Sequence, residues 1–204
     1  MSYQVLSLKL RPQRFDEVIG QTHVTRTLQN AIGLDRVAHG YIFSGPRGVG
    51  KTTTARILAK VLNCKNPQGN NPCGTCVNCK EITQGSNLDV QELDGASNRG
   101  IDEIRDLREA VKYPPSNGKY RIYIIDEVHM LTGPAFNALL KTLEEPPPHV
   151  IFIMATTDAH KVPATILSRT QRFDFKQIST NDISGYLTQI LESENIKYDS
   201  DGIR

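Results

Sequence analysis

The chain has 204 residues, of which 38% are hydrophobic and 23% are charged, and its formal net charge is +2. This balance is typical of a soluble globular fold and excludes a disordered chain, while so small a net charge neither requires nor excludes a polyanionic partner. No stretch reaches the ~18 consecutive apolar residues of a membrane span, and the N-terminus lacks the apolar core of a secretory signal, so we expect a cytoplasmic protein with no membrane partner.

Alternating apolar and amphipathic segments indicate the fold class. Four short apolar segments rich in β-branched residues are typical of buried strands, and three amphipathic segments have the apolar spacing of helices. The predicted strands lie at residues 41–43, 89–93, 121–126 and 150–157. The predicted helices lie around residues 57–62, 101–111 and 136–143. Such alternation is typical of an α/β fold, in which a parallel sheet is covered on both faces.

The third helix and the end of the chain carry clear boundary signals. Thr132 and Pro134 are expected to begin that helix, and the segment EEPPP at 144–148 to end it. Further on, the segment STNDISGYLTQILESENI predicts a capped helix and no further strand. We therefore predict an α/β domain over residues 1–178 and the beginning of a helical second domain over residues 179–204.

The segment GPRGVGKT follows the first predicted strand, opens the first helix and matches the phosphate-binding pattern G-x-x-x-x-G-K-[ST]. In such a loop the backbone N–H groups point at phosphate oxygens, and the helix N-terminus adds positive potential. Lys51 is expected to reach the β- and γ-phosphates, and Thr52 to ligate Mg²⁺. The pattern therefore predicts a nucleotide site. Its candidate residues are Gly45, Pro46, Arg47, Gly48, Val49, Gly50, Lys51, Thr52 and Thr53.

The third predicted strand delivers Asp126 and Glu127 to the carboxyl end of the sheet, where ligands of open α/β sheets bind. Asp126 is expected to hold Mg²⁺ and Glu127 to polarise the attacking water in phosphoryl transfer. The fourth strand ends at Thr157, whose hydroxyl could lie between the metal-site carboxylate and the γ-phosphate, or could simply end a strand. Arg169 follows an amphipathic turn, a place where most arginines are solvated surface residues.

All four cysteines lie within the segment CKNPQGNNPCGTCVNC, at Cys64, Cys73, Cys76 and Cys79. Four soft thiolate ligands, separated by residues that permit tight reversals, predict a structural Zn²⁺ with no open coordination position. The segment is too short and polar to bury a core, so the metal would supply its folding free energy. The alternatives are disulfides or free thiols, and an iron–sulfur cluster, for which the downstream C-x3-C-P partner is missing.

Together these motifs resemble the gamma/tau subunit family of bacterial DNA polymerase III, the ATPases of the sliding-clamp loader. The resemblance extends over essentially the whole chain, as the N-terminal portion of such a subunit. It implies an AAA+ P-loop NTPase core with a five-stranded parallel sheet, a zinc-binding insertion at about 64–79 and the start of a small helical lid domain. The segments that carry it are GPRGVGKTTTARILAKVLNC, IIDEVHMLTGPAFNALLKTLEEPP, FIMATTDAHKVPATILSRTQRF and LRPQRFDEVIGQ.

The resemblance also implies roles for individual residues. Lys51 and Thr52 would be the Walker A pair, Asp126 and Glu127 the Walker B pair, and Thr157 the sensor-1 residue. Arg169 would be an arginine finger that acts on ATP bound by the neighbouring subunit. The family usually has Ser-Arg-Cys here, and this chain has Ser-Arg-Thr, which leaves the packing role of the third position open. The candidate adenine contacts are Arg11, Pro12, Val18 and Ile19.

Basic residues on two predicted helices are candidates for contact with DNA. Arg99 and Arg105 belong to the helix around 101–111, and Lys141 belongs to the next helix. Arginines and a helix N-terminus suit phosphate oxygens, and clamp loaders track the backbone of a primer–template duplex. The alternative is an ordinary solvated helix face, because acidic residues are interspersed. Contacts of the first kind would be independent of base sequence and sensitive to salt.

The leading hypothesis for function is an ATPase motor subunit that loads the sliding clamp onto primed DNA, with ATP, Mg²⁺ and structural Zn²⁺ as cofactors. Its expected partners are the other clamp-loader subunits in a hetero-oligomeric ring, the sliding clamp and primer–template DNA. Polymerase and helicase would join if a tau-type extension exists. One alternative is an AAA+ DNA-remodelling motor such as a branch-migration helicase. The other is a non-hydrolysing scaffold subunit, which the intact nucleotide motifs argue against.

Overall fold

The computed structural model describes residues 10–194 and 196–203. Within these ranges a sheet of five strands forms the centre of the molecule, in the order β2-β3-β4-β1-β5, and every neighbouring pair is parallel. This confirms the α/β fold with a five-stranded parallel sheet. The strands are β1 (Gly40–Ser44), β2 (Val90–Asp94), β3 (Arg121–Asp126), β4 (Val150–Thr156) and β5 (Gln171–Asp174).

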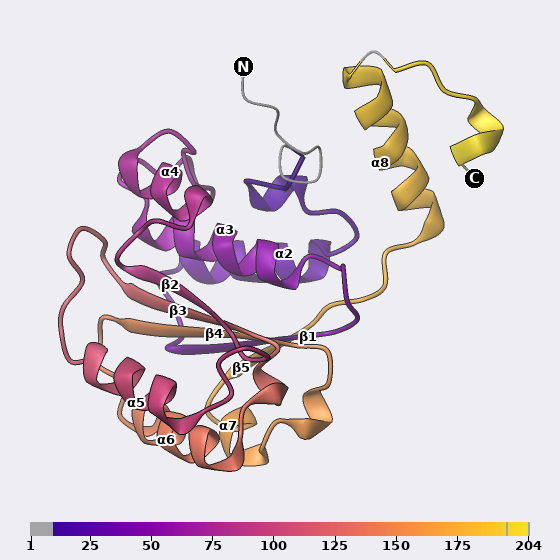
Figure 1. Ribbon diagram of the computed structural model, residues 1–204. Coiled ribbons are helices and arrows are strands. Elements are labelled where there is room, and N and C mark those ends of the chain that lie inside the picture. The colour runs from indigo at the N-terminus through magenta and orange to yellow at the C-terminus, as the bar shows by residue number, and fades with distance from the viewer. Residues whose placement is uncertain (1–9, 195, 204) are drawn as a thin grey trace.

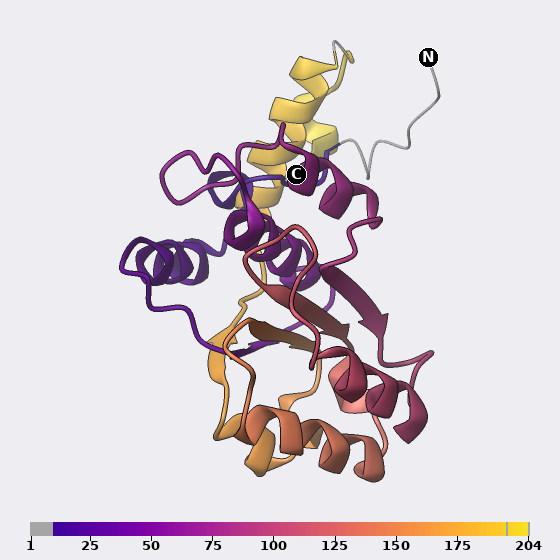
Figure 2. The same ribbon diagram turned by 90° about the vertical axis from the view of Figure 1, so that its left-hand side faces the viewer.

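Helices cover both faces of the sheet. In Figures 1 and 2, α2, α3 and α4 form one layer, and α5, α6 and α7 form the layer on the opposite face. The longer helices are α2 (Thr22–Gly33), α3 (Lys51–Asn63), α4 (Val77–Gln84), α5 (Ile101–Ala110), α6 (Gly133–Glu144) and α8 (Thr180–Ser193). The short elements are η1 (Phe15–Glu17), η2 (Val128–Met130), η3 (Ala159–Lys161), α7 (Ala164–Leu167) and η4 (Ser200–Ile203).

The central strands are apolar throughout because both of their faces are buried. In β3, Ile122 and Ile124 pack into the cluster formed with α2 and α3, whereas Tyr123 and Ile125 pack into the cluster formed with α5 and α6. Successive side chains of a strand point to opposite faces, so one strand contributes to both cores. The sheet is thereby held between two apolar layers, and its carboxyl edge is a rigid platform.

The predicted boundaries of α6 are confirmed, because the Thr132 hydroxyl accepts a hydrogen bond from the Ala135 N–H at 3.4 Å and the helix ends at Glu144. Three of the longer elements, α2, α4 and β5, are absent from the predicted pattern. The edge strand β5 buries only Phe173, so its four residues show no apolar run. The helix α4 lies directly after the third cysteine, and its mostly polar sequence lacks the apolar spacing that would predict a helix.

The helix predicted after the last strand is α8, and Ser179 caps it by accepting a hydrogen bond from the Asp182 N–H at 3.1 Å. None of its residues is buried, and it lies beyond the layer formed by α2, α3 and α4 (Figure 1). Positions 1–9, 195 and 204 of the predicted domains lie outside the described residues. No helix in the described part of the chain combines the length and the apolar content needed to span a membrane.

A buried carboxylate holds the connection that precedes β3. Asp89 is 1% exposed and accepts hydrogen bonds from the backbone N–H groups of Ser116, Asn117 and Gly118 at 2.6 to 2.7 Å. Burial raises the pKa of Asp89, but these three donors together bring it below its usual value. The folded state therefore favours the ionised form, and this contribution to stability exists above the unfolded-state pKa of about 3.9.

We predict that Asp89→Asn lowers the free energy of unfolding by about 2 kcal/mol at pH 7, because the amide replaces a charged acceptor and turns two of its own donors toward N–H groups. The difference from wild type is expected to shrink as the pH falls below about 4, because the unfolded-state carboxylate takes up a proton there while the native one is still ionised, and to be smallest below the lowered native pKa. Urea denaturation at several pH values measures both effects. Asp106→Asn, at an exposed position of α5, is the control. A difference that stays constant down to pH 2.5 would contradict the prediction.

Candidate nucleotide site and cysteine cluster

The loop between β1 and α3 has a backbone that glycine residues make possible. Gly45, Gly48 and Gly50 have φ angles of 147°, 80° and 95°, which side chains other than hydrogen rarely allow. A Cβ at Gly45 would also collide with the carbonyl oxygen of Phe175, which follows β5. The loop can therefore lie close against the neighbouring chain and deliver the N-terminus of α3 to the carboxyl edge of the sheet.

Lys51 is the first residue of α3, and its side chain folds back over the loop. Its ammonium group donates hydrogen bonds to the carbonyl oxygens of Gly45 at 2.8 Å and Pro46 at 2.6 Å. Burial lowers the pKa of Lys51, and the carboxylates of Glu127 and Asp126 oppose this shift. The structure thus places the amine between the loop and the two carboxylates predicted from the sequence.

Asp126 lies at the end of β3 and meets the first turn of α3. The Thr52 hydroxyl donates to Asp126 Oδ2 at 2.7 Å, so the two predicted magnesium ligands are brought together. Gly95, which sequence reasoning missed, donates its N–H to the Asp126 carbonyl at 2.8 Å. A Cβ on Gly95 would lie 2.7 Å from the Glu127 carbonyl oxygen, so only glycine fits. The dipeptide Asp-Gly directly after a strand was the signal that could have identified it.

Glu127 has a left-handed backbone, with φ of 45°, which is uncommon for a residue with a side chain. Its Oε2 accepts hydrogen bonds from the Thr157 hydroxyl at 2.9 Å and from the Thr157 N–H at 3.3 Å. His129 Nδ1 lies 3.3 Å from the same oxygen and 3.0 Å from the Thr156 hydroxyl. Thr157 therefore contacts the carboxylate of Glu127, and His129 is a neighbour that sequence reasoning did not assign to the site.

Lys51, Thr52, Asp126 and Glu127 line a polar cavity of about 490 Å³, whereas Thr157 and His129 contact Glu127 without lining it. Asp94, at the end of β2, is an additional carboxylate in its wall, and its pKa is lowered because the Ser97 hydroxyl and the Ala96 N–H donate to it. The cavity combines a loop rich in N–H donors, an amine and acidic groups, which suits a phosphate chain with a divalent cation. Its lining residues are Arg11, Arg47, Gly48, Gly50, Lys51, Thr52, Thr53, Asp94, Asp126 and Glu127.

A second, apolar cavity of about 250 Å³ adjoins the loop. Pro12, Val18 and Ile19, three of the four candidate adenine contacts, line it, and Arg11 lines the polar cavity instead. The opposite wall comes from α8, where Ile183 and Leu187 are 45% and 42% exposed. A flat apolar ring would cover these side chains. Their contribution was not predicted, because α8 gave no signal beyond its amphipathic spacing.

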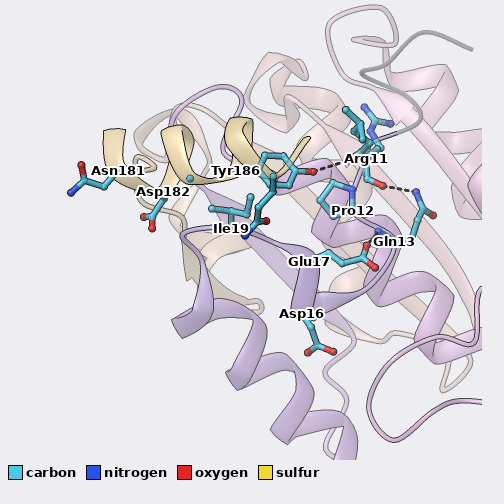
Figure 3. Close-up of a pocket in the computed structure, with 12 residues that line it drawn as sticks. Arg11, Pro12, Gln13, Asp16, Glu17, Ile19, Asn181, Asp182 and Tyr186 are labelled. Carbon is cyan, nitrogen blue, oxygen red and sulfur yellow. Dashed lines mark hydrogen bonds between the residues drawn. The ribbon is translucent and has the colours of Figure 1, made fainter. Parts of the chain in front are cut away.

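A wider cleft of about 770 Å³ separates the segment 10–19 from α8. Figure 3 shows Arg11 and Pro12 to the right of the Tyr186 ring of α8, and Ile19 below Tyr186. The Tyr186 hydroxyl donates to the Leu10 carbonyl oxygen at 3.1 Å, which ties α8 to the N-terminal segment.

Arg169 lies at the opposite edge of the sheet from the phosphate-binding loop. It precedes β5, and its carbonyl oxygen lies beside Gly40, the first residue of β1, whereas the loop follows the last residue of that strand. Its guanidinium forms an ion pair with Glu144 at the end of α6, at 2.9 Å. A strand of five residues separates the two edges by roughly 13 Å, so Arg169 is not part of the cavity formed by its own chain.

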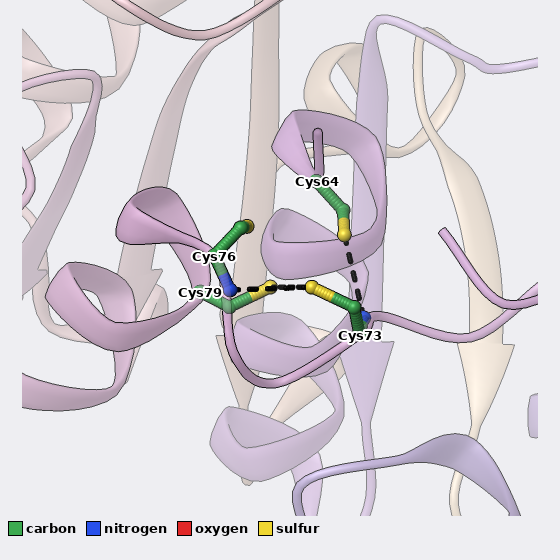
Figure 4. Close-up of side chains that lie close together, drawn as sticks. All are labelled: Cys64, Cys73, Cys76 and Cys79. Carbon is green, nitrogen blue, oxygen red and sulfur yellow. Dashed lines mark hydrogen bonds between the residues drawn. The ribbon is translucent and has the colours of Figure 1, made fainter. Parts of the chain in front are cut away.

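The four cysteines form a compact cluster in the cysteine module, which we define as residues 64–84 (Figure 4). Their sulfur atoms all lie within 4.8 Å of one another, and Cys73 Sγ and Cys79 Sγ are 4.0 Å apart. Four thiolates around one zinc ion at about 2.3 Å would lie about 3.8 Å apart, so the arrangement fits a tetrahedral site. All four are free of disulfide bonds.

Backbone N–H donors and burial have opposite effects on the thiol pKa values of the cluster, and burial prevails at Cys64, whose pKa is raised. The Cys73 N–H donates to Cys64 Sγ and the Cys76 N–H donates to Cys73 Sγ, both at 3.3 Å. Donation from the N–H groups of Cys76 and Thr75 lowers the pKa of Cys73 to about 6, whereas burial raises the pKa of Cys79. The donor set has the chemistry that a soft divalent metal requires.

The three candidate DNA contacts lie in the layer formed by α5 and α6. Arg99 precedes α5, Arg105 lies within it, and Lys141 lies in α6, and all three are exposed. Arg105 also forms an ion pair with Asp102 at 3.1 Å. The structure brings the basic residues to one side of the molecule, together with the acidic neighbours that the sequence shows.

Known structures share this fold. A RuvB protein of Thermotoga maritima superposes with a TM-score of 0.66 at 18% identity, over 95% of this chain and 58% of RuvB. A DNA polymerase III gamma subunit-related protein of the same organism superposes with a TM-score of 0.53 at 22% identity, over 82% of this chain and 52% of that one. At these identities the likeness shows the fold alone.

Sequence comparison is more specific. The family model described as DNA polymerase III, delta subunit, matches residues 20–179. The chain is 57% identical to the DNA polymerase III subunit tau of Bacillus subtilis over 97% of its own length, and 52% identical to that of Escherichia coli over 98%. It is 48% identical to a DNA polymerase III subunit gamma of Buchnera aphidicola over 98% of its length.

The chain spans about a third of the tau subunits, 35% and 31%, and 55% of that gamma subunit. The resemblance stated from the motifs is thus confirmed over nearly every residue of the chain. The chain belongs to the DNA polymerase III subunit family that contains the gamma and tau subunits.

Proposed function

We propose that this protein is an ATPase motor subunit of a clamp loader, in which ATP binding and hydrolysis drive loading of a sliding clamp onto primed DNA. The observation that carries the proposal is the polar cavity, where Lys51, Thr52 and Asp126 meet at the edge of the sheet and Glu127 lies beside them. A subunit that served only as a scaffold would not need this intact set. Membership of the gamma and tau family supplies the replication context.

Four residues of the cavity would take part in hydrolysis, namely Lys51, Thr52, Asp126 and Glu127. Lys51 would exchange its loop carbonyl partners for the β- and γ-phosphate oxygens, which are stronger acceptors. Glu127 would orient and polarise the attacking water, and its contact with Thr157 fixes the carboxylate. Thr52 and Asp126 offer the hard oxygen ligands that fit Mg²⁺. When bound, this ion would offset the negative charge that develops on the phosphate oxygens.

Arg169 would act on the nucleotide of a neighbouring subunit. Within its own chain it lies across the sheet from the cavity and is held by Glu144 on the surface. In a hetero-oligomeric ring of clamp-loader subunits, a surface arginine of this kind can reach the adjacent cavity and stabilise charge in the transition state. Hydrolysis would then depend on assembly of the ring around clamp and primer–template DNA.

The cysteine module would hold a structural Zn²⁺ through Cys64, Cys73, Cys76 and Cys79. The compact sulfur cluster favours a single ion over a four-iron cluster, in which each thiolate binds a different iron and the sulfur atoms must lie farther apart. The cytoplasmic location expected from the sequence agrees with reduced thiols. A polymerase and a helicase would be further partners if the complete protein carries a tau-type extension.

A branch-migration motor is the second candidate, because RuvB structures share the fold. The identity of 18% to RuvB, against 57% to the tau subunit of Bacillus subtilis, favours the clamp loader. The two functions also differ in their requirement for the clamp, which an activity assay resolves.

Substitutions of Lys51 and Arg169 test the nucleotide site. In a complex reconstituted with sibling subunits, Lys51→Ala should abolish ATP binding, because the charge that holds the phosphates is lost. Arg169→Ala should retain ATP binding, but the rate of ATP hydrolysis stimulated by clamp and primed DNA should fall by about 10³-fold. Steady-state ATPase and nucleotide-binding measurements separate these effects. Arg26→Ala, at an exposed position of α2, is the control.

Stimulation by any DNA without clamp would favour the remodelling motor, and equal loss of nucleotide binding in Arg169→Ala would contradict action in trans.

The metal content of the protein tests the cysteine module. Protein purified under reducing conditions should contain one zinc ion per chain and little iron, as elemental analysis measures. Cys79→Ser should release the metal and expose the module to protease, because the buried thiolate is replaced by a weak ligand. Ser86→Ala, outside the ligand set, should keep its zinc. Iron in the wild type, or zinc retained at full occupancy without Cys79, would refute the site.

A charge reversal at Arg105 tests the contact with DNA. Arg105→Glu should weaken binding of the assembled complex to primed DNA of any sequence and should make the slope of log affinity against log salt shallower by about 1 to 2. Fluorescence anisotropy at several salt concentrations measures this slope. Arg26→Glu makes the same charge change at an exposed position of α2, a helix of the opposite layer, and is the control. Unchanged affinity and slope in Arg105→Glu would exclude this face as the DNA contact.

A further inference from the structure

The cysteine module touches the segment that lines the apolar cavity. Asn71 is 7% exposed, and its side-chain oxygen accepts a hydrogen bond from the Phe15 N–H at 3.1 Å. Its amide nitrogen donates to Asp16 Oδ2 at 2.7 Å. A single side chain of the module therefore satisfies a buried backbone donor of the N-terminal segment and fixes the start of η1.

A second link is formed through Gln13. Its side-chain oxygen accepts from the ammonium group of Lys60 at 2.5 Å and lies 3.2 Å from the hydroxyl of Thr83 in α4. Thr83 in turn donates to the carbonyl oxygen of Cys79 at 2.8 Å. On its other side, the Gln13 amide donates to the Arg11 carbonyl oxygen at 2.8 Å. Gln13 thus joins the module and α3 to the backbone beside Pro12.

The position of Asn71 depends on the geometry of the module. Gln68 and Asn71 form a tight turn, with backbone hydrogen bonds of 2.9 and 3.2 Å in the two directions. The turn lies two residues before Cys73, so the cluster of sulfur ligands anchors it. Arg14 adds a contact by donating to the Gln68 side chain at 2.9 Å.

The segment 10–20 has little regular structure of its own. It contains one short 3₁₀ helix, and within it only Phe15 is buried. A segment with so few packing contacts gains its order from side-chain hydrogen bonds, which must offset the conformational entropy of fixing the backbone. Asn71 and Gln13 supply such bonds from outside the segment.

We propose that the cysteine module positions the base-binding wall of the nucleotide site, and that Asn71 and Gln13 are its positioning residues. This inference rests on the proposed binding of ATP. The module would then have a role beyond its own folding, because its hydrogen bonds fix the segment that carries Pro12, Val18 and Ile19. The phosphate-binding loop is built by β1 and α3 and does not depend on these links.

The test compares two ligands of the full chain, Mg-ATP and Mg-tripolyphosphate, by titration calorimetry. Tripolyphosphate contacts the loop but has no base. Asn71→Ala and Gln13→Ala are expected to weaken ATP binding by about tenfold and to leave tripolyphosphate binding within about twofold of wild type. Asn87→Ala is the matched control, because Asn87 is equally buried at 7% and bonds Glu81 and Asp89 rather than the N-terminal segment.

The outcomes are distinguishable from failure of the proposed function. If wild type binds neither ligand, the nucleotide site itself is wrong. If wild type binds ATP and both variants bind it equally well, the positioning role is refuted. An equal loss of both ligands in Asn71→Ala, Gln13→Ala and Asn87→Ala would report general destabilisation and would also overturn the inference. Gln13 is only partly buried, so its substitution keeps the test valid if Asn71→Ala folds poorly.

Discussion

The alignment of strand ends at the carboxyl edge of the sheet is the constraint on which the candidate site depends. Ser44 of β1 is paired with Thr156 of β4, and β4 in turn is paired with β3, which ends at Asp126. Adjacent strands lie about 4.8 Å apart, so the loop after β1 and the carboxylate after β3 are about 10 Å apart. The first turn of α3 crosses this gap, and the hydrogen bond between Thr52 and Asp126 closes it.

The backbone at this edge is strained at Glu127, the residue proposed to polarise the attacking water. Glu127 adopts a left-handed conformation, which costs roughly 1 to 2 kcal/mol for a residue with a side chain. Close packing against Gly95 and the contacts to Thr157 and His129 hold it there. The two apolar clusters on the faces of the sheet contribute the stability that offsets this strain. In this conformation Glu127 lines the polar cavity.

The phosphate-binding part and the base-binding part of the site differ in how firmly the surrounding fold packs against them. The phosphate-binding loop and the carboxylates belong to the rigid core, whereas the base-binding wall is formed by an irregular segment and by α8, which buries none of its side chains. The cysteine module contacts the irregular segment of this wall through Asn71, which bonds Phe15 and Asp16.

The sequence by itself determined the α/β class, four of the five strands, the phosphate-binding loop and the four cysteines, because each depends on local spacing or on a short chain segment. Buried strands such as β4 are recognisable from their apolar runs. The elements β5, α4 and α2 were not predicted, since β5 has one buried side chain, α4 is mostly polar, and α2 buries only Val24, Thr25 and Leu28. Only the tertiary structure decided that Gly95 packs against the backbone of Asp126 and Glu127 and that His129 lies beside Glu127. It also decided that α8 lines the apolar cavity and that Arg169 lies at the opposite edge of the sheet from its own chain's site. These facts arise from strand order and helix placement, which join residues far apart in the sequence.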